Sequence, residues 1–148
     1  MSLLDTLQKD MVAAMKAKDK QKLSTIRMLK AAATNEKINL GHDLTPDEEV
    51  AVLARELKQR KDSLEEFKAA DRPDTVASLE EEIKVVQAYL PAQLSEEEVK
   101  SIVAETIATV HAETPGDFGK VMGAVMPKLK GKADGKLVNS VVKELLAN

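Results

Sequence analysis

The stretch YLPAQLSEEE, residues 89–98, divides the chain into two helical parts. Pro91 ends the helix before it, because a proline lacks the N–H donor and its ring opposes a carbonyl of the preceding turn. Ser95 and Glu98 then form the S-x-x-E pattern of a capping box, which predicts the start of a new helix. Long helices give way to short ones across this polar joint. We therefore expect two domains, over residues 1–90 and 91–148.

The N-terminal part carries the signals of four long helices. Gly41 is placed to end the second helix, since glycine readily takes the left-handed conformation found there. Thr45, Pro46 and Glu48 supply the N-cap, the first-turn proline and the capping-box carboxylate of the third helix, which we expect to run to about Ala70. Apolar residues recur at spacings of three and four, and no strand-like alternation is convincing anywhere in the chain. This pattern predicts an antiparallel bundle of long helices.

Arg60 stands in an apolar stripe of the third helix, midway between Leu53 and Phe67. An arginine in such a place either extends its apolar stem until the guanidinium reaches water, or meets a carboxylate or a phosphate. We expect a partner within the bundle rather than a contact with a ligand.

The C-terminal part carries three shorter helices, of which the first follows Ser95. The second begins near Phe118, and Pro127 is expected to end or kink it. Asp134 is placed to cap the third. A domain of this size is near the lower limit for folding alone. The chain is thus predicted to be all-α, with an N-terminal long-helix bundle and a small C-terminal three-helix domain.

The composition excludes several classes of function. Aromatic residues make up 2% of the chain, which is too few for the stacking platforms that bind single-stranded nucleic acid. Cysteine is absent, so disulfides and thiolate chemistry are excluded. The N-terminus gains charge by its fifth residue, so we expect no signal peptide, and no apolar run approaches the roughly 20 residues of a membrane span. We expect a soluble cytoplasmic protein that does not enter a membrane.

The net charge of −3 conceals a sharp local asymmetry. Residues 91–117 hold six acids and one base, whereas residues 118–143 hold six lysines and one acid. On the last predicted helix the polar residues follow at spacings of four, three and four, and they line one face if the first of them, Lys132, lies on or just before the first turn. The backbone N–H groups at the start of this helix favour phosphate, and glycines at 131 and 135 would let a polyanion approach the backbone closely. The candidate nucleic-acid-binding residues are Lys128, Lys130, Lys132, Lys136, Asn139 and Lys143. They form either a contact for an RNA or DNA backbone or an ordinary solvated lysine face, and the residues alone leave both open.

No catalytic residue, metal site or cofactor is predicted. GKADGK, residues 131–136, has three residues between its glycines and lacks the Ser or Thr and the preceding strand of a phosphate-binding loop. His42 and His111 each stand alone, without the spacing of zinc ligands. No Ser-His-Asp order or nucleophile elbow is present. We therefore lean against an autonomous enzyme.

Four stretches of the chain carry a resemblance to a known family: TIRMLKAA, LKQRKDSLEEFKAADRPD, VVQAYLPAQLSEEE and DFGKVMGAVMPKLKGKADGKLVNSVVKELL. They resemble the YqeY family, and the resemblance runs along the whole length of the chain. Residues 118–146 are also similar to the C-terminal tail of GatB, a subunit of the tRNA-dependent amidotransferase that converts Glu-tRNA(Gln) to Gln-tRNA(Gln). The resemblance implies a helical domain joined to a tail-like domain that helps to hold tRNA, since the catalytic work of the amidotransferase belongs to other parts.

Three functions remain open at this point. The first is a tRNA-binding accessory module that holds the RNA backbone through the lysine face. The second is a protein-interaction module that seats a partner on the heptad-like stripe of the N-terminal helices. The third is an accessory of a carbon–nitrogen ligase that uses glutamine as amido donor, which rests on the association with GatB and on no residue of this chain.

Overall fold

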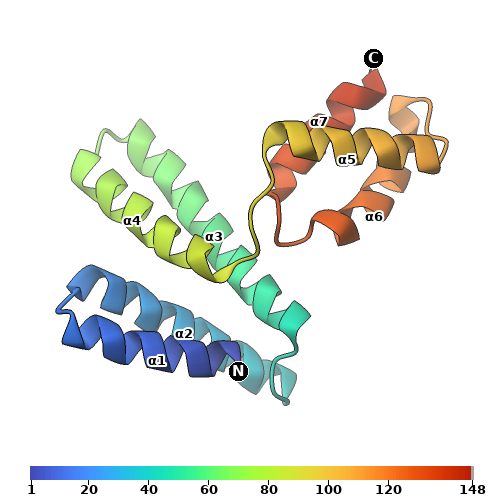
Figure 1. Cartoon of the computed structure of the whole chain (residues 1–148). Coiled ribbons are helices and arrows are strands. Elements are labelled where there is room, and N and C mark those ends of the chain that lie inside the picture. The colour runs from blue at the N-terminus through green and yellow to red at the C-terminus, as the bar shows by residue number, and fades with distance from the viewer. Residues whose placement is uncertain (148) are drawn as a thin grey trace. The chain divides into compact units, whose positions relative to one another are not determined.

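The computed structural model describes residues 1–147, and these form helices and connecting turns without a strand. This confirms the all-α prediction. The chain separates into two compact units, Met1–Leu90 and Pro91–Asn148, which we call the N-terminal and C-terminal units. The helices in chain order are α1 (Leu3–Lys16), α2 (Lys20–Leu40), α3 (Pro46–Ala69), α4 (Pro73–Tyr89), α5 (Glu96–Thr109), the 3₁₀ turn η1 (Pro115–Asp117), α6 (Phe118–Leu129) and α7 (Gly135–Ala147) (Figure 1).

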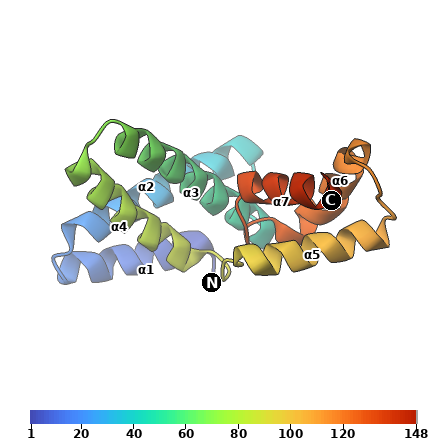
Figure 2. The same ribbon diagram turned by 90° about the horizontal axis from the view of Figure 1, so that it is seen from above.

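The N-terminal unit consists of two helical hairpins, α1 with α2 and α3 with α4. Helix α2 packs against both α3 and α4, so the hairpins share one core. The two views of the ribbon show the two hairpins (Figures 1 and 2). The core is aliphatic, as the scarcity of aromatic residues requires. Its buried members are Leu7, Ala14, Ile26, Leu29, Leu53, Leu57, Ile83, Val86 and Leu90.

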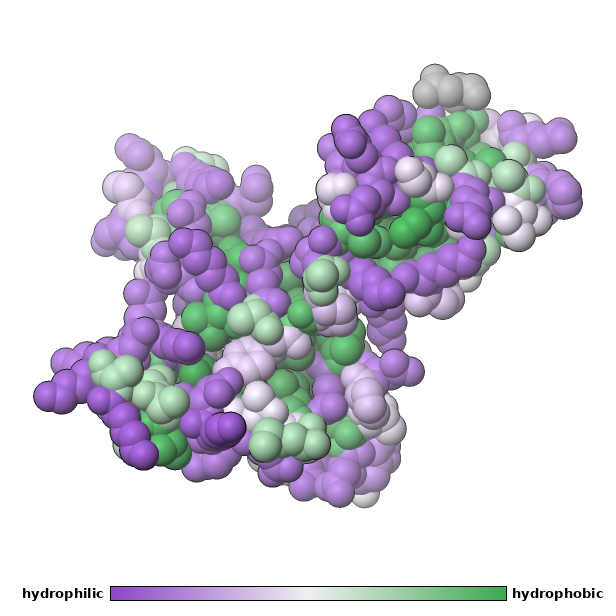
Figure 3. All heavy atoms as spheres, viewed as in Figure 1, coloured by the Kyte–Doolittle hydropathy of each residue, from purple (hydrophilic) through white to green (hydrophobic). Residues whose placement is uncertain are grey.

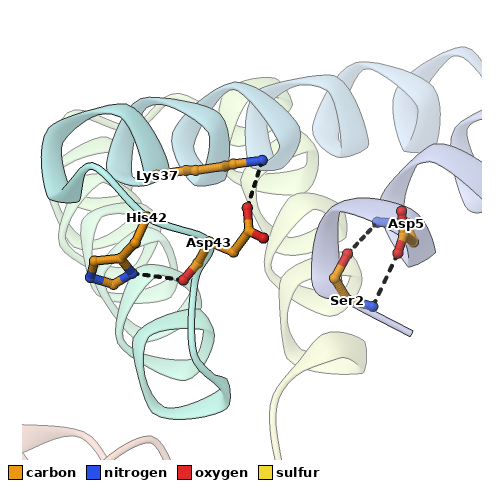
Figure 4. Close-up of polar contacts among 5 residues, drawn as sticks. All are labelled: Ser2, Asp5, Lys37, His42 and Asp43. Atoms are coloured by element: carbon orange, nitrogen blue, oxygen red, sulfur yellow. Dashed lines mark hydrogen bonds and ion pairs between the residues drawn. The ribbon is translucent and has the colours of Figure 1, made fainter.

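The predicted helix starts are formed by local hydrogen bonds. At α3, the backbone N–H of Glu48 donates to Thr45 Oγ1 over 3.2 Å, and the backbone N–H of Thr45 donates to Glu48 Oε1 over 2.9 Å. Ser2 caps α1 in the same way with Asp5 (Figure 4), and Ser95 caps α5. Each box satisfies two backbone donors that a helix start leaves unpaired. The helix starts predicted from these caps are confirmed.

Arg60 meets a carboxylate within its own helix. Its Nη1 lies 2.8 Å from Glu56 Oε2 and 3.1 Å from the Glu56 carbonyl oxygen, and its Nη2 lies 3.8 Å from Met28 Sδ. The residue is 8% exposed, and its Nε finds no hydrogen-bond partner among the described residues. Arg60 therefore has a partner inside the bundle, as we expected, and that partner is one helical turn away.

The C-terminal unit is built around α5, which packs against both α6 and α7. Of the two outcomes expected at Pro127, an end or a kink, the end does not occur, because α6 continues to Leu129. A proline removes a single N–H donor, and the next turn still closes, since the Lys130 N–H donates to the Met126 carbonyl over 2.9 Å. The buried core is Val99, Val103, Ala112, Val121, Val125, Leu129, Val138, Val141, Val142 and Leu146.

The acid stability of the C-terminal unit depends in part on Asp117. Its Oδ2 accepts the backbone N–H groups of Glu113 and Thr114 over 2.9 and 3.2 Å, and these bonds hold the pKa of the carboxyl below its usual value. A pKa that is lower in the folded than in the unfolded chain contributes stability above the unfolded value, about 3.9, and loses it as the pH falls through the folded pKa.

We therefore expect Asp117→Asn to flatten the acid limb of the stability curve. Between pH 6 and pH 3 the thermal midpoint of wild-type protein should fall further than that of the variant. Thermal unfolding followed by circular dichroism measures both. Glu113→Gln is the matched control, since the exposed Glu113 enters this network through its backbone N–H. Equal acid limbs for wild type and Asp117→Asn would contradict the assignment.

Candidate nucleic-acid interface

The turn between α6 and α7, residues 130–134, carries the centre of the predicted site, and we call it the basic turn. Lys132 donates its backbone N–H to the Leu129 carbonyl over 2.9 Å, which closes the turn after the end of α6. Gly131 has a φ of +76°, a conformation that strongly favours glycine. Lys130 and Lys132 flank this glycine, and both side chains are exposed.

Helix α7 carries three of the other predicted residues. It begins at Gly135, so Lys132 lies just before the helix, which is one of the two placements expected for it. Lys136, Asn139 and Lys143 follow on α7 at spacings that place them on one side of the helix. Lys136 is exposed next to the basic turn, whereas Asn139 is half-buried.

Lys128 and Lys143 are engaged inside the C-terminal unit. Lys128 Nζ donates to Thr106 Oγ1 over 3.3 Å, and Thr106 is buried on α5. Lys143 Nζ lies 5.7 Å from the centre of the Phe118 ring, within the range of a cation–π contact. The sequence did not reveal these contacts, because each joins residues that are more than 20 positions apart and on different elements. Of the six predicted residues, these two have a structural role in the unit.

The start of α7 differs from the expected anion-binding helix terminus. Asp134 Oδ1 accepts the backbone N–H of Lys136 over 2.9 Å, so one of the donors that we assigned to phosphate is already occupied by a carboxylate. Gly131 is buried, which corrects the expectation that a polyanion could approach the backbone there, while Gly135 is exposed with open space around it. The cationic groups exposed at this end of the unit are therefore lysine side chains, and the helix terminus offers at least one donor fewer than expected.

The sequence analysis also missed two residues that hold the basic turn. Gln93 Nε2 donates to the Gly131 carbonyl over 2.8 Å, and the backbone N–H of Leu94 donates to the Lys132 carbonyl over 2.8 Å. These bonds connect the start of the C-terminal unit to its basic turn. A polar residue followed by a leucine after Pro91 gave no signal of a contact with residues nearly 40 positions away.

The N-terminal unit holds a cleft whose lining differs from the basic turn. It has a volume of about 510 Å³ and lies among α1, α2 and α4. Tyr89 donates its hydroxyl proton to Asp10 Oδ2 over 2.5 Å, and burial followed by this hydrogen bond raises the pKa of Tyr89 well above its usual value. Lys22, Lys84 and Glu81 also line the cleft. Acids and lysines both line the cleft, so its charge is mixed and does not favour a phosphate.

The opposite end of this unit has a small polar cluster. Lys37 Nζ lies 3.0 Å from Asp43 Oδ1, and His42 Nδ1 lies 2.7 Å from the Asp43 carbonyl oxygen (Figure 4). His42 Nε2 is 3.5 Å from Glu48. Within residues 1–147, no three His, Asp or Glu side chains are grouped so that they could hold a metal ion. The cluster therefore closes the loop between α2 and α3.

Comparison with known proteins places the whole chain. A family model described as Yqey-like protein matches residues 4–146. The chain is 30% identical over 148 residues to altered inheritance of mitochondria protein 41, mitochondrial, from Pyrenophora tritici-repentis, and the match covers 97% of this chain and 81% of that protein. The protein of the same name from Lachancea thermotolerans is 35% identical over 113 residues, covering 74% of this chain and 60% of that protein.

Larger proteins match part of the chain. A glutamyl-tRNA(Gln) amidotransferase subunit from Thermococcus gammatolerans is 46% identical over 54 residues, which is 34% of this chain and 9% of that protein. Its counterpart from Thermococcus sibiricus is 39% identical over 98 residues, 62% of this chain and 15% of that protein. These relatives support the resemblance to an amidotransferase tail, although their names designate a different amidotransferase component from GatB. Because the family model reaches from α1 into α7, the chain belongs to the YqeY family.

Proposed function

We propose that the C-terminal unit binds the phosphate backbone of tRNA, as an accessory module without catalytic activity of its own. The observation that carries the proposal is the basic turn, where Lys130 and Lys132 stand exposed on a backbone fixed by hydrogen bonds, with exposed Lys136 two residues after its end. Lysine ammonium groups meet phosphates as point charges, and such contacts position a nucleic acid without reading its sequence.

Two further observations support this role. The segment around the turn is strongly basic, whereas the preceding segment of the same unit is strongly acidic, so the positive potential is concentrated on one part of the unit. The amidotransferase relatives carry tRNA in their names, and they match 34% to 62% of this chain. The described residues include no helix long and apolar enough to cross a membrane. We propose that the protein binds tRNA in the cytoplasm. Mitochondria are the alternative, suggested by the relatives' names.

The test is the affinity of the full chain for labelled tRNA as a function of salt. If three to four lysines neutralise phosphates, affinity should fall roughly 40- to 150-fold between 50 and 200 mM monovalent salt, because counterions are released on binding. Fluorescence anisotropy with a mixture of tRNAs measures this slope, and different tRNAs should bind with similar affinity. Saturable binding that does not respond to salt, or no binding at low salt, would contradict the proposal.

A protein-interaction role for the N-terminal unit is the second candidate. The large apolar side chains that remain exposed among residues 1–147 all belong to this unit: Met1, Val12, Met15, Met28, Ile38 and Leu40. In the space-filling view, apolar side chains reach the surface of this unit between hydrophilic ones (Figure 3). Exposed apolar surface favours partner binding over nucleic-acid binding. This candidate takes the lead if the wild-type chain does not bind tRNA at low salt.

A further inference from the structure

The joint between the units, residues 91–93, is short, because the residues on both sides of it belong to the packed cores. Leu90 is buried in the core of the N-terminal unit, and Leu94 packs against the core of the C-terminal unit. Pro91, Ala92 and Gln93 stand between them, and all three are exposed. Proline fixes one backbone dihedral angle, so the freedom of the joint lies mainly at Ala92 and Gln93.

The Gln93 side chain spans the joint and the basic turn. Its Nε2 donates to the Pro91 carbonyl over 3.0 Å and to the Gly131 carbonyl over 2.8 Å. The neighbouring Leu94 N–H donates to the Lys132 carbonyl over 2.8 Å. Two consecutive carbonyls of the basic turn are therefore held by two consecutive residues of the joint.

This arrangement fixes the backbone that carries Lys130 and Lys132. Lys130 is the C-cap that follows the last residue of α6, and Gly131 then turns the chain through a left-handed conformation. A single glycine in such a turn is conformationally permissive, so contacts from outside the turn add to the Lys132-to-Leu129 bond in favouring one conformation. The Gln93 and Leu94 bonds supply those contacts on the carbonyl side and leave the side chains of Lys130 and Lys132 exposed.

We propose that Gln93 is a positioning residue that couples the joint to the basic turn, so that a polyanion bound at the turn stabilises the joint and a disordered joint weakens binding. The half that concerns RNA rests on the proposed function, whereas the coupling of joint and turn does not. Linkage requires the effect to be reciprocal. If an ordered joint raises the affinity for RNA by some free energy, bound RNA stabilises the ordered joint by the same free energy.

The variants are chosen to separate position from charge. Gln93→Ala removes the donor without changing the net charge, and the lysines are untouched. Gln93→Glu retains the length of the side chain but directs a carboxylate toward the Gly131 carbonyl, so it should disturb the turn more strongly. Gln59→Ala, at an exposed glutamine of α3, is the control for loss of a glutamine side chain.

The first measurement is hydrogen exchange at the Leu94 and Lys132 amides of the full chain without RNA. Both amides are donors in bonds that fix the turn. Gln93→Ala should raise their exchange rates roughly three- to tenfold, as expected for the loss of one hydrogen bond, and should increase protease cleavage at residues 91–94. Unchanged exchange and cleavage would overturn the coupling, whether or not the protein binds RNA.

The second measurement adds tRNA at low salt. Wild-type protein should be protected from cleavage at residues 91–94, and Gln93→Ala should bind roughly three- to tenfold more weakly with an unchanged salt slope, because no charge is lost. A variant that exchanges faster but binds tRNA as tightly as wild type would overturn the coupling to binding. Absence of tRNA binding by wild-type protein would overturn the proposed function and, with it, the RNA half, while the exchange result still decides the structural half.

Discussion

Replacing Lys130, Lys132 and Lys136 together by glutamate is expected to abolish tRNA binding while the C-terminal unit stays folded. Each substitution removes an attraction to phosphate and adds a repulsion, so affinity at about 50 mM salt should fall by more than roughly a hundredfold. All three side chains are exposed, and none belongs to the buried core. Anisotropy with labelled tRNA measures the loss, and circular dichroism verifies the helical content.

The control for this triple variant is an equal change of net charge in the other unit. Lys9, Lys16 and Lys20 are exposed on α1 and at the start of α2, and their replacement by glutamate should affect tRNA affinity far less. If both triple variants weaken binding alike, the lysines near the basic turn are ordinary solvated surface.

A contrast within the C-terminal unit separates binding from structure. Lys128 contacts Thr106 and Lys143 contacts Phe118. Lys128→Ala and Lys143→Ala should therefore lower the midpoint of thermal unfolding of the unit, while the dissociation constant for tRNA changes comparatively little.

Val141→Glu is expected to unfold the C-terminal unit and leave the N-terminal unit intact. Val141 is 1% exposed among the aliphatic side chains of the core formed by α5, α6 and α7. An uncompensated buried charge costs about 3–5 kcal/mol. A helical unit of this size has roughly 3–5 kcal/mol of stability in total. The helical signal should therefore lose the share that α5, α6 and α7 contribute.

Backbone NMR spectra of the full chain distinguish the two units. Amides of the C-terminal unit should collapse to unfolded positions in Val141→Glu, while those of the N-terminal unit stay dispersed, because each unit has its own core. Ser140→Glu, at the exposed neighbouring position, is the control and should remain folded. Leu137 is only half-buried, so Leu137→Glu should destabilise the unit less than Val141→Glu. A folded Val141→Glu variant would show that the core of the unit lies elsewhere.

The helix ends were predictable because their causes are local. The capping boxes at Thr45 and Ser95 depend on residues three positions apart. Gly41, in a left-handed conformation, directly follows the last residue of α2. The partner of Arg60 could also have been found, since Glu56 lies at the i,i+4 spacing at which helical side chains meet. Local spacing thus explains most of the fold.

The candidate site was less predictable because its details depend on long-range contacts. The Lys128 to Thr106 contact and the Gln93 to Gly131 bond each join residues brought together only by folding. Pro127 does not end α6, one of the two outcomes expected there, because the remaining bonds of the last turn outweigh the one donor that proline lacks. A lysine pattern reveals the charge of a segment, but the packing of the unit decides which of its lysines remain available.

The most direct test of the RNA-binding proposal is the acetylation rate of every lysine in the full chain, with and without tRNA at low salt, measured by mass spectrometry. The account predicts that bound tRNA slows modification of Lys130, Lys132 and Lys136 several-fold, leaves Lys9, Lys16 and Lys20 unchanged, and loses its effect as salt is raised. Protection spread evenly over both units, or confined to the N-terminal helices, would contradict it.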